Sequence, residues 1–449
     1  MAAAASGNDI DLLSDLVAKA RKAGAETADA VLVRSTSLGV SYRMGKPEDL
    51  ERSESQDLGL RILIGKQQAV VSSTDLTAAT LDELVSRGID MARASPEDAF
   101  AGLADPALLC TEVIDLDLYD ANEPTPEALY EQAAAAEAAA LAVPGVSNSE
   151  EAGASWGEGA IALATSHGFA GGYRSSSHSF YASVLAGEGT GMERDFEFTS
   201  AHHGSDLDDP ATVGRLAGEG AVKRLNPRKV QTCQVPVIYD PRVSRSLLGH
   251  FAGAVSGISV ARGTSFLKDR MEQPVFAAGI RIVDDPHRPR GLSSKPFDGE
   301  GVQNRRMVVV EDGRLQTWFL DSSAARQLGL VTTGHASRGT SGPPAPSSTN
   351  LYMEAGTASP EELIGGIEDG LYITELIGFG VNGVTGDYSR GASGYWIEKG
   401  ALAYPVSELT IAGNLKDMFA NLTPANDLEF RYGTNAPTLR IDGLTVAGS

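Results

Sequence analysis

Few side chains that could bind a metal or act as a nucleophile occur in this sequence, and their spacing restricts their chemistry. Among the seven histidines there is no HExxH spacing, which would place two imidazoles and a glutamate on one face of a helix. His202 and His203 are adjacent and are followed by Asp206 and Asp208. Neighbours on an extended chain point to opposite faces, so we interpret this pair as solvated residues before a helix start.

Two glycine motifs resemble catalytic or cofactor loops but lack the required surroundings. Residues 153–157 match GxSxG around Ser155, a motif that presents a nucleophile only on a strand-to-helix turn. Strand-forming residues 160–165 follow instead, which favours a hairpin turn. Residues 378–383 match GxGxxG, yet the glycine-punctuated polar run 384–394 cannot open the helix that a dinucleotide site needs. We therefore expect a tight loop there.

The elements that would position any site begin with a helix, several strands and a second helix. Apolar spacing predicts a first helix from Asn8 or Asp9 to Gly24 and a second over 77–94. Between them, runs rich in β-forming residues predict strands at 30–33, 38–42, 58–64 and 69–72. Thr125 and Pro126 open an alanine-rich helix that ends at Pro144, and short β-like runs over 146–203 predict an antiparallel meander.

A boundary between two domains is expected near residue 228. Asp209 and Pro210 start a helix that ends near Leu225, and the basic, proline-containing segment 226–229 follows it. We predict an N-terminal α/β domain with antiparallel strands over 1–228. The C-terminal domain, 229–449, is predicted to be β-rich, sheet-like or barrel-like, with few helices, so the fold class is mixed α/β or α+β.

One helix of the C-terminal domain has a strongly apolar face. After a strand at 235–239, Asp240 and Pro241 predict a helix start, and apolar residues then recur every four positions. The residues of this stripe are Val243, Leu247, Phe251 and Val255. Beyond Gly263 we expect short strands and glycine turns, and the three prolines within 342–348 suggest an exposed loop or lid.

Composition excludes several classes of protein. The 449 residues include 59 acidic and 37 basic side chains, a formal charge of −22, so the overall field repels nucleic acids and anionic membranes. No run of about 18 apolar residues predicts a membrane span. The two cysteines, Cys110 and Cys233, form no CxxC motif, which indicates reduced thiols in the cytoplasm.

Five ordered segments of the second half resemble the TldD/PmbA family, also called modulator-of-gyrase type peptidases, and in particular its PmbA/TldE branch. The segments are LLGHFAGAVSGISVARGTSFL (247–267), FDGEGVQNRRMVVVEDG (297–313), AARQLGLVTTGHASR (324–338), TNLYMEAG (349–356) and GFGVNGVTGDYSRGASGYWIEKG (378–400). The resemblance implies a link to peptide cleavage. The N-terminal half is similar in length and element order.

The resemblance also implies where catalysis would reside. In the TldD branch the helix corresponding to residues 241–255 carries HExxxH, which holds a metal and a water-activating glutamate, and a C-terminal cysteine completes the site. This chain has His250, but Phe251 and Val255 replace the glutamate and the second histidine, and Asn435 stands near the place of the cysteine. We therefore expect no metal, no cofactor and no catalytic residue in this chain.

The resulting hypothesis is a PmbA/TldE-like non-metal subunit of a cytoplasmic peptidase complex, with a TldD-like metallopeptidase subunit as its partner. Its substrates would be unfolded or modified peptides, held at exposed strand edges of a closed chamber. The polar residues expected at the substrate or subunit interface are His250, Asn350, Asp387, Ser389 and Arg390. In isolation we expect a homodimer.

Two alternatives stay open on the sequence. The chain could be a stand-alone metallopeptidase that uses His250 with His335 or an acidic partner such as Glu300. It could instead be a homodimeric peptide-binding or chaperone-like module. Whether the chain is itself an enzyme is not decided by these residues.

Overall fold

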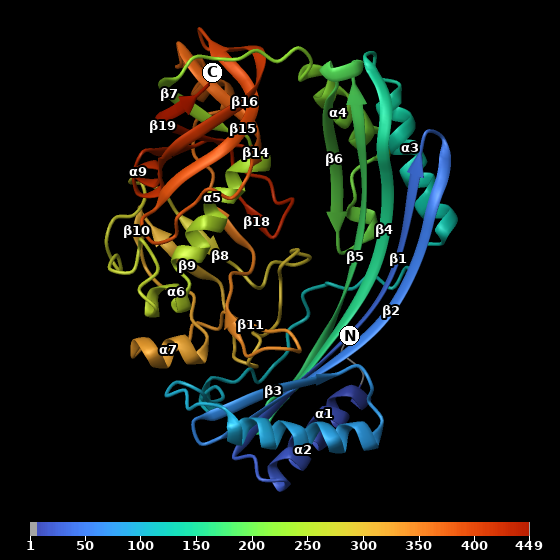
Figure 1. Cartoon of the computed structure of the whole chain (residues 1–449), viewed down its shortest axis with the longest axis vertical. Helices are drawn as coiled ribbons and strands as arrows, with labels where there is room; N and C mark the ends of the chain where they lie inside the picture. The colour runs from blue at the N-terminus through green and yellow to red at the C-terminus, as the bar shows by residue number, and fades with distance from the viewer. Residues whose placement is uncertain (1–6, 449) are drawn as a thin grey trace.

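The computed structural model describes residues 7–448, and its first half is built on one long antiparallel sheet (Figure 1). The strand order is β3-β2-β1-β4-β5-β6. The strands are β1 (Thr27–Arg43), β2 (Lys46–Ile64), β3 (Gln67–Ser73), β4 (Val146–Thr165), β5 (Ala170–Ala186) and β6 (Glu193–Ala201). The antiparallel meander predicted for 146–203 is confirmed as β4, β5 and β6.

Strand lengths differ from the prediction. The two short strands expected at 30–33 and 38–42 are one continuous strand, β1, and β2 begins twelve residues earlier than expected, at Lys46. The added part of β2 is polar and exposed, so it has no apolar alternation that a sequence pattern could detect. The hairpin turn expected at Ser155 is also wrong, because Ser155 lies within β4, opposite Gly39 and Ser179.

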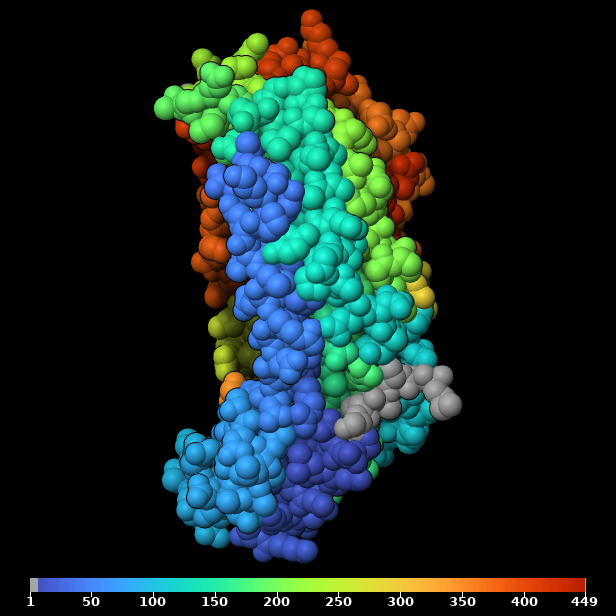
Figure 2. Space-filling view, turned by 90° about the vertical axis from the view of Figure 1, so that its right-hand side faces the viewer, coloured from blue at the N-terminus to red at the C-terminus, as the bar shows by residue number. Residues whose placement is uncertain are grey.

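Four helices cover this sheet in two pairs. α1 (Gly7–Lys22) and α2 (Ala78–Ala94) lie at one end, and α3 (Pro126–Leu141) and α4 (Pro210–Lys223) lie along the other (Figure 1). As predicted, Thr125 and Asp209 cap their helices, since their side-chain oxygens accept from Ala128 N (3.3 Å) and Thr212 N (2.9 Å). Figure 2 shows α3 running lengthwise beside the β1–β2 ribbon on the outer surface.

The alanine-rich character of α3 follows from its close contact with α4. A Cβ added at Gly214 of α4 would lie 1.9 Å from the carbonyl oxygen of Ala136 in α3. The two backbones therefore approach so closely that only small side chains fit between them. Short 3-10 turns, η1 (Pro106–Leu108), η2 (Gly189–Gly191) and η3 (Gly204–Asp206), interrupt the connections.

The second half contains a closed five-stranded barrel and few helices, so the predicted fold class is confirmed. The barrel order is β16-β15-β14-β7-β19, and β16 pairs with β19 to close it. Its strands are β7 (Cys233–Tyr239), β14 (Asp369–Ile377), β15 (Asp387–Glu398), β16 (Ala401–Asn414) and β19 (Leu439–Ala447), with β17 (Leu422–Pro424) attached to β19. α5 (Pro241–Ala254) contacts strands of this barrel.

A smaller sheet and short helices complete this half. The sheet order is β10-β9-β8-β13-β18, formed by β8 (Ile282–Asp284), β9 (Met307–Glu311), β10 (Arg314–Leu315), β13 (Leu351–Met353) and β18 (Thr434–Asn435). The helices are α6 (Gly257–Ala261), α7 (Ser322–Leu328), α8 (Pro360–Gly365) and α9 (Leu415–Ala420). No helix within residues 7–448 is long and apolar enough to cross a membrane.

Polar side chains join the two halves. The Arg326 guanidinium donates to the carbonyl oxygens of Phe100, Gly102 and Leu103 at 2.7–3.1 Å. Part of the segment 342–348, predicted as an exposed loop or lid, forms a short strand: β12 (Ala345–Pro346) pairs with β11 (Ala336–Ser337). The proposed domain boundary at 228/229 stays a prediction; Arg228 there donates its N–H to Pro405 of β16 at 2.9 Å.

Candidate functional site

The apolar stripe of α5 lies in the core, as predicted. Val243, Leu247, Phe251 and Val255 are all buried. The Phe251 ring meets Phe276 at 5.2 Å and Phe419 at 6.3 Å, both in edge contacts. Asp240 caps the helix, since its Oδ1 accepts from Arg242 N at 2.9 Å, and its Oδ2 accepts from the Tyr372 hydroxyl at 2.6 Å. Phe251 and Val255 therefore have no access to a ligand.

His250 lies on the side of α5 that faces β15. Its Nε2 is buried and has no hydrogen-bond partner among residues 7–448, and its ring lies 6.1 Å from the Tyr388 ring. Desolvation, and then the positive charge of Arg390, lower the pKa of His250 below its usual value. Burial raises the pKa of Tyr388 to about 12. The site therefore presents a neutral imidazole and a neutral phenol beside a guanidinium.

The five predicted interface residues do not converge on one point. Tyr388 and Arg390 share one face of β15 because residues two apart in a strand point the same way, whereas Asp387 and Ser389 point to the other face. Both Asp387 and Ser389 are exposed. Hydrogen bonds from Thr385 Oγ1 (2.6 Å) and Asn414 Nδ2 (3.0 Å) lower the pKa of Asp387.

Asn350 lies elsewhere and holds loops together. Its Nδ2 donates to the Asp285 carbonyl and to Ser294 Oγ, each at 2.7 Å, while its Oδ1 accepts from Ser293 N at 2.9 Å. The amide is almost fully buried and its donors are both used. Of the five residues, His250 lies near the face of β15 that carries Tyr388 and Arg390, whereas Asn350 lies apart from this strand.

The surroundings of His250 do not fit a catalytic metal. A catalytic zinc site uses three protein ligands, and within residues 7–448 no group of three or more His, Cys, Asp or Glu side chains could hold a metal ion. Arg390 next to the imidazole would repel a cation. Asn435 is buried and its Oδ1 accepts from Arg431 N and Tyr432 N, at 3.0 and 2.9 Å. His250 and Asn435 therefore fit structural roles.

The remaining motifs are also structural. Ser155 Oγ pairs with Ser179 Oγ at 2.8 Å, and the GxGxxG residues form the turn between β14 and β15. The expectation of a solvated histidine pair is wrong for His202, which is buried between the carbonyl oxygens of Ser176 (2.6 Å) and Gly291 (3.1 Å). Ser176 and Gly291 lie far from His202 in the sequence, so a local pattern could not predict that they bury this ring.

Half of β5 has an unpaired edge that sequence reasoning missed. β6 pairs with β5 only from His178 onward, so residues 170–177 lack a partner strand on that side. Ser176 N donates away from β4, to Leu118 O at 2.9 Å. Because N–H directions alternate along a strand, the N–H and C=O groups of Gly172 and Arg174 point to this same edge. The edge faces segment 113–119, and Gly172 itself is buried. Within the described residues, no other backbone reaches these groups.

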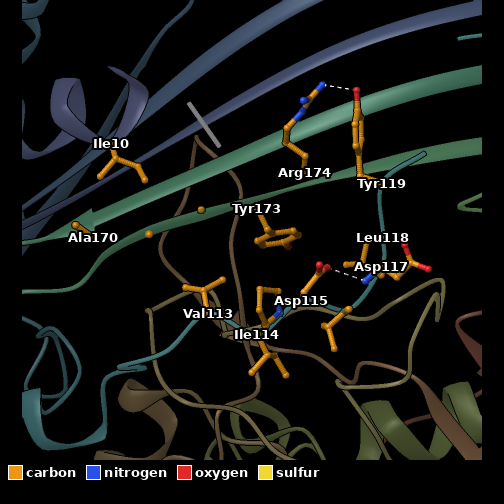
Figure 3. A pocket seen from close by; sticks show the side chains of 14 residues that line it. Ile10, Val113, Ile114, Asp115, Asp117, Leu118, Tyr119, Ala170, Tyr173 and Arg174 are labelled. Carbon is orange, nitrogen blue, oxygen red and sulfur yellow. Dashed lines mark hydrogen bonds between the residues drawn. The ribbon is translucent and has the colours of Figure 1, made fainter. Parts of the chain in front are cut away.

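A cavity of about 420 Å³ adjoins this edge (Figure 3). It lies between β5 residues 170–174 and the extended segment 113–119, and Ile10 and Pro296 also line it. Figure 3 shows the Tyr173 ring within it and Val113, Ile114 and Leu118 nearby, while Arg174 donates to the Tyr119 hydroxyl at 2.7 Å. Sequence reasoning did not use the alternation of aspartate and leucine over 115–118, which could have indicated this extended segment.

Comparison with known proteins assigns the class. Models described as PmbA/TldA metallopeptidase domain 1, central domain and C-terminal domain match residues 28–92, 119–225 and 232–448. The chain belongs to the PmbA/TldD peptidase family, and the resemblance found in the sequence is confirmed.

Individual relatives refine this placement. The chain is 38% identical to Metalloprotease PmbA of Escherichia coli O157:H7, over 96% of this chain and 94% of that protein. It is 36% identical to the Metalloprotease PmbA homolog of Haemophilus influenzae, over 97% and 95%. A Bacteroides thetaiotaomicron protein provisionally named a modulator of DNA gyrase has a TM-score of 0.89 at 27% identity, covering 99% of this chain and all of that one. TldE from Thermococcus kodakarensis shares the fold, with a TM-score of 0.86 at 19% identity and coverage of 97% and 100%.

Proposed function

We propose that this chain is the PmbA/TldE-like, non-metal subunit of a cytoplasmic peptidase complex, and that a TldD-like metallopeptidase subunit supplies the metal and activates the water. The observation that carries this proposal is the burial of the apolar side chains of α5. Phe251 and Val255, which stand where metal chemistry would need a glutamate and a histidine, lie in the core, and Arg390 puts a positive charge beside His250.

The contribution of this chain would be to hold unfolded or modified peptides. The part of β5 without a partner strand has main-chain donors and acceptors next to a cavity, an arrangement that can bind an extended peptide by strand addition. Main-chain hydrogen bonds give affinity with little dependence on peptide sequence.

The face of the sheet turned away from α3 and α4 supports this role, since its small polar residues impose little side-chain preference. They include Ser37, Ser155, Gly157, Ser177 and Ser179.

The contact with the partner would include the turn between β14 and β15. Phe379 in this turn is 98% exposed, and Ile377 and Val384 are more than half exposed. Large apolar side chains gathered on one loop are typical of a subunit interface. This turn adjoins Asp387, Ser389 and Arg390, so we propose that it contacts the TldD-like subunit and, in isolation, a second copy of this chain.

Reconstitution tests the function directly. Peptide hydrolysis is measured for the TldD-like subunit alone, this chain alone and their mixture. We expect no cleavage by this chain, no zinc bound to it, and faster cleavage by the mixture than by the partner. Chelator-sensitive cleavage by this chain alone, or equal rates with and without it, would refute the proposal.

Interface variants test the contact. Phe379→Asp should abolish both co-purification of the TldD-like subunit and dimer formation in size-exclusion chromatography. Met44→Asp is the matched control, because Met44 is also exposed, at 53%, but lies on the β1–β2 turn. Loss of pairing in both variants, or in neither, would count against this surface.

A further inference from the structure

A second, smaller cavity lies where the sheet meets the second half of the chain. Its volume is about 90 Å³. Its walls on the sheet side are apolar and come from β1, β4 and β5, namely Val31, Val33, Ile161, Leu163 and Tyr173. The remaining lining residues are Lys295, Phe297, Asp298, Gly299, Ser337 and Arg338. Tyr173 lines this cavity and also the larger one shown in Figure 3.

Arg338 lines this cavity and has unused hydrogen-bond donors. Its side chain is 2% exposed and is anchored through Nη1, which donates to Asp29 Oδ1 at 2.6 Å. Its Nε and Nη2 are buried and have no hydrogen-bond partner in the part of the chain that the structure describes. These two nitrogens form the edge of a guanidinium that binds the two oxygens of a carboxylate side by side. Arg61 uses the same edge, Nε and Nη2, to hold Asp29.

Lys295 adds a second cation without a partner. Within residues 7–448 its ammonium makes no hydrogen bond and no ion pair within 4.0 Å. Burial lowers its pKa, although the charges of Asp298 and Asp284 act in the opposite direction. Asp298 does not compensate it directly, because its oxygens already accept from Glu300 N, Val302 N and Ala336 N at 2.8–3.1 Å.

A buried donor without a hydrogen-bond partner costs free energy, so cations with unused donors favour the binding of an anion. The apolar walls at the other end favour a hydrocarbon group. We propose that this cavity is a binding site for a carboxylate that carries a short apolar group, with its oxygens on Arg338 and Lys295 and its tail against Val31, Ile161 and Phe297. This inference goes beyond the proposed function and does not rest on it.

The size of the cavity sets the size of the ligand. One water needs on the order of 10–15 Å³ measured in this way, so 90 Å³ holds roughly six to nine heavy atoms. A five-carbon branched carboxylic acid such as 3-methylbutanoate meets this limit. The same chemistry occurs in the C-terminal residue of a peptide that ends in leucine or valine, so two sources share one mode of binding.

Calorimetric titration of the full-length protein tests the site. The probes are 3-methylbutanoate, its amide, and the tripeptide Ala-Ala-Leu with either a free or an amidated C-terminus. We expect saturable binding of a free carboxylate, and affinity at least about tenfold lower for the matching amide, because each lost charge-assisted hydrogen bond costs about that factor. Tighter binding of the tripeptide assigns the peptide terminus as ligand, and tighter binding of the small acid assigns a free acid.

Variants of the walls make the test specific. Lys295→Met should weaken carboxylate binding about tenfold, and Val33→Phe should abolish it by filling the cavity. Lys268→Met is the matched control, because Lys268 is an exposed lysine in the second half and should leave binding unchanged. Arg338 is left intact because it also holds Asp29, and thermal unfolding verifies that each variant folds.

Three results would overturn the proposal: no saturable binding of either carboxylate, equal binding of acid and amide, or unchanged affinity in Lys295→Met.

Discussion

Replacing Phe251 with glutamate tests whether α5 is a structural helix. Phe251 is fully buried against Phe276 and Phe419. Removing such a ring costs about 3–5 kcal/mol, and burying an unpaired carboxylate adds several kcal/mol. Domains of this kind are stable by roughly 5–15 kcal/mol. We therefore expect Phe251→Glu to lose at least about 4 kcal/mol of unfolding free energy, which should lower the urea midpoint strongly.

The assay is urea unfolding followed by circular dichroism, with and without added zinc. Gly249→Glu is the matched control: Gly249 lies on the exposed side of the same helix and a Cβ there meets nothing within 4 Å. This control should keep or slightly raise the unfolding midpoint, since glutamate favours a helix more than glycine does. Zinc should not rescue Phe251→Glu, because only one imidazole lies nearby. A wild-type midpoint for Phe251→Glu, or its recovery in zinc, would refute the reasoning.

Three further predictions follow from the sheet edge and the buried charges. Gly172→Pro, which removes a donor from the open edge of β5, should weaken binding of extended peptides without lowering the unfolding temperature; unchanged affinity would contradict strand addition there. Asp29→Asn should cost about 3–5 kcal/mol in urea unfolding, because two buried arginines lose a shared counter-charge. Glu219→Gln, at a partly exposed ion pair of α4, should cost less than about 1 kcal/mol. Burial, and then the Glu300 carboxylate, raise the pKa of Asp298 to about 8, so the folded state keeps a proton that the unfolded chain loses above about pH 4. The free energy of unfolding should thus fall as pH rises from about 4 to about 8, and a profile that rises over this window would contradict the assignment.

Local patterns predicted much of the fold. The caps Thr125, Asp209 and Asp240 depend on side-chain oxygens that reach their own helix, so neighbouring residues suffice to locate these helix starts. The buried stripe of α5 follows from its helical period alone. The length of β2 does not follow from its local sequence, because residues 46–57 form a strand only through pairing with β1.

Some features of the candidate site were likewise predicted from the sequence, and others depend on the tertiary structure. The sequence by itself determined that Phe251 and Val255 replace the side chains that metal chemistry would need, since that depends only on residue type and position in a motif. Only the tertiary structure placed Arg390 beside His250 and buried the amide of Asn350 among loops. It alone left the edge of β5 open and brought Arg338 and Lys295 to one cavity. Those contacts join residues far apart in the chain, and no local pattern encodes which of them meet.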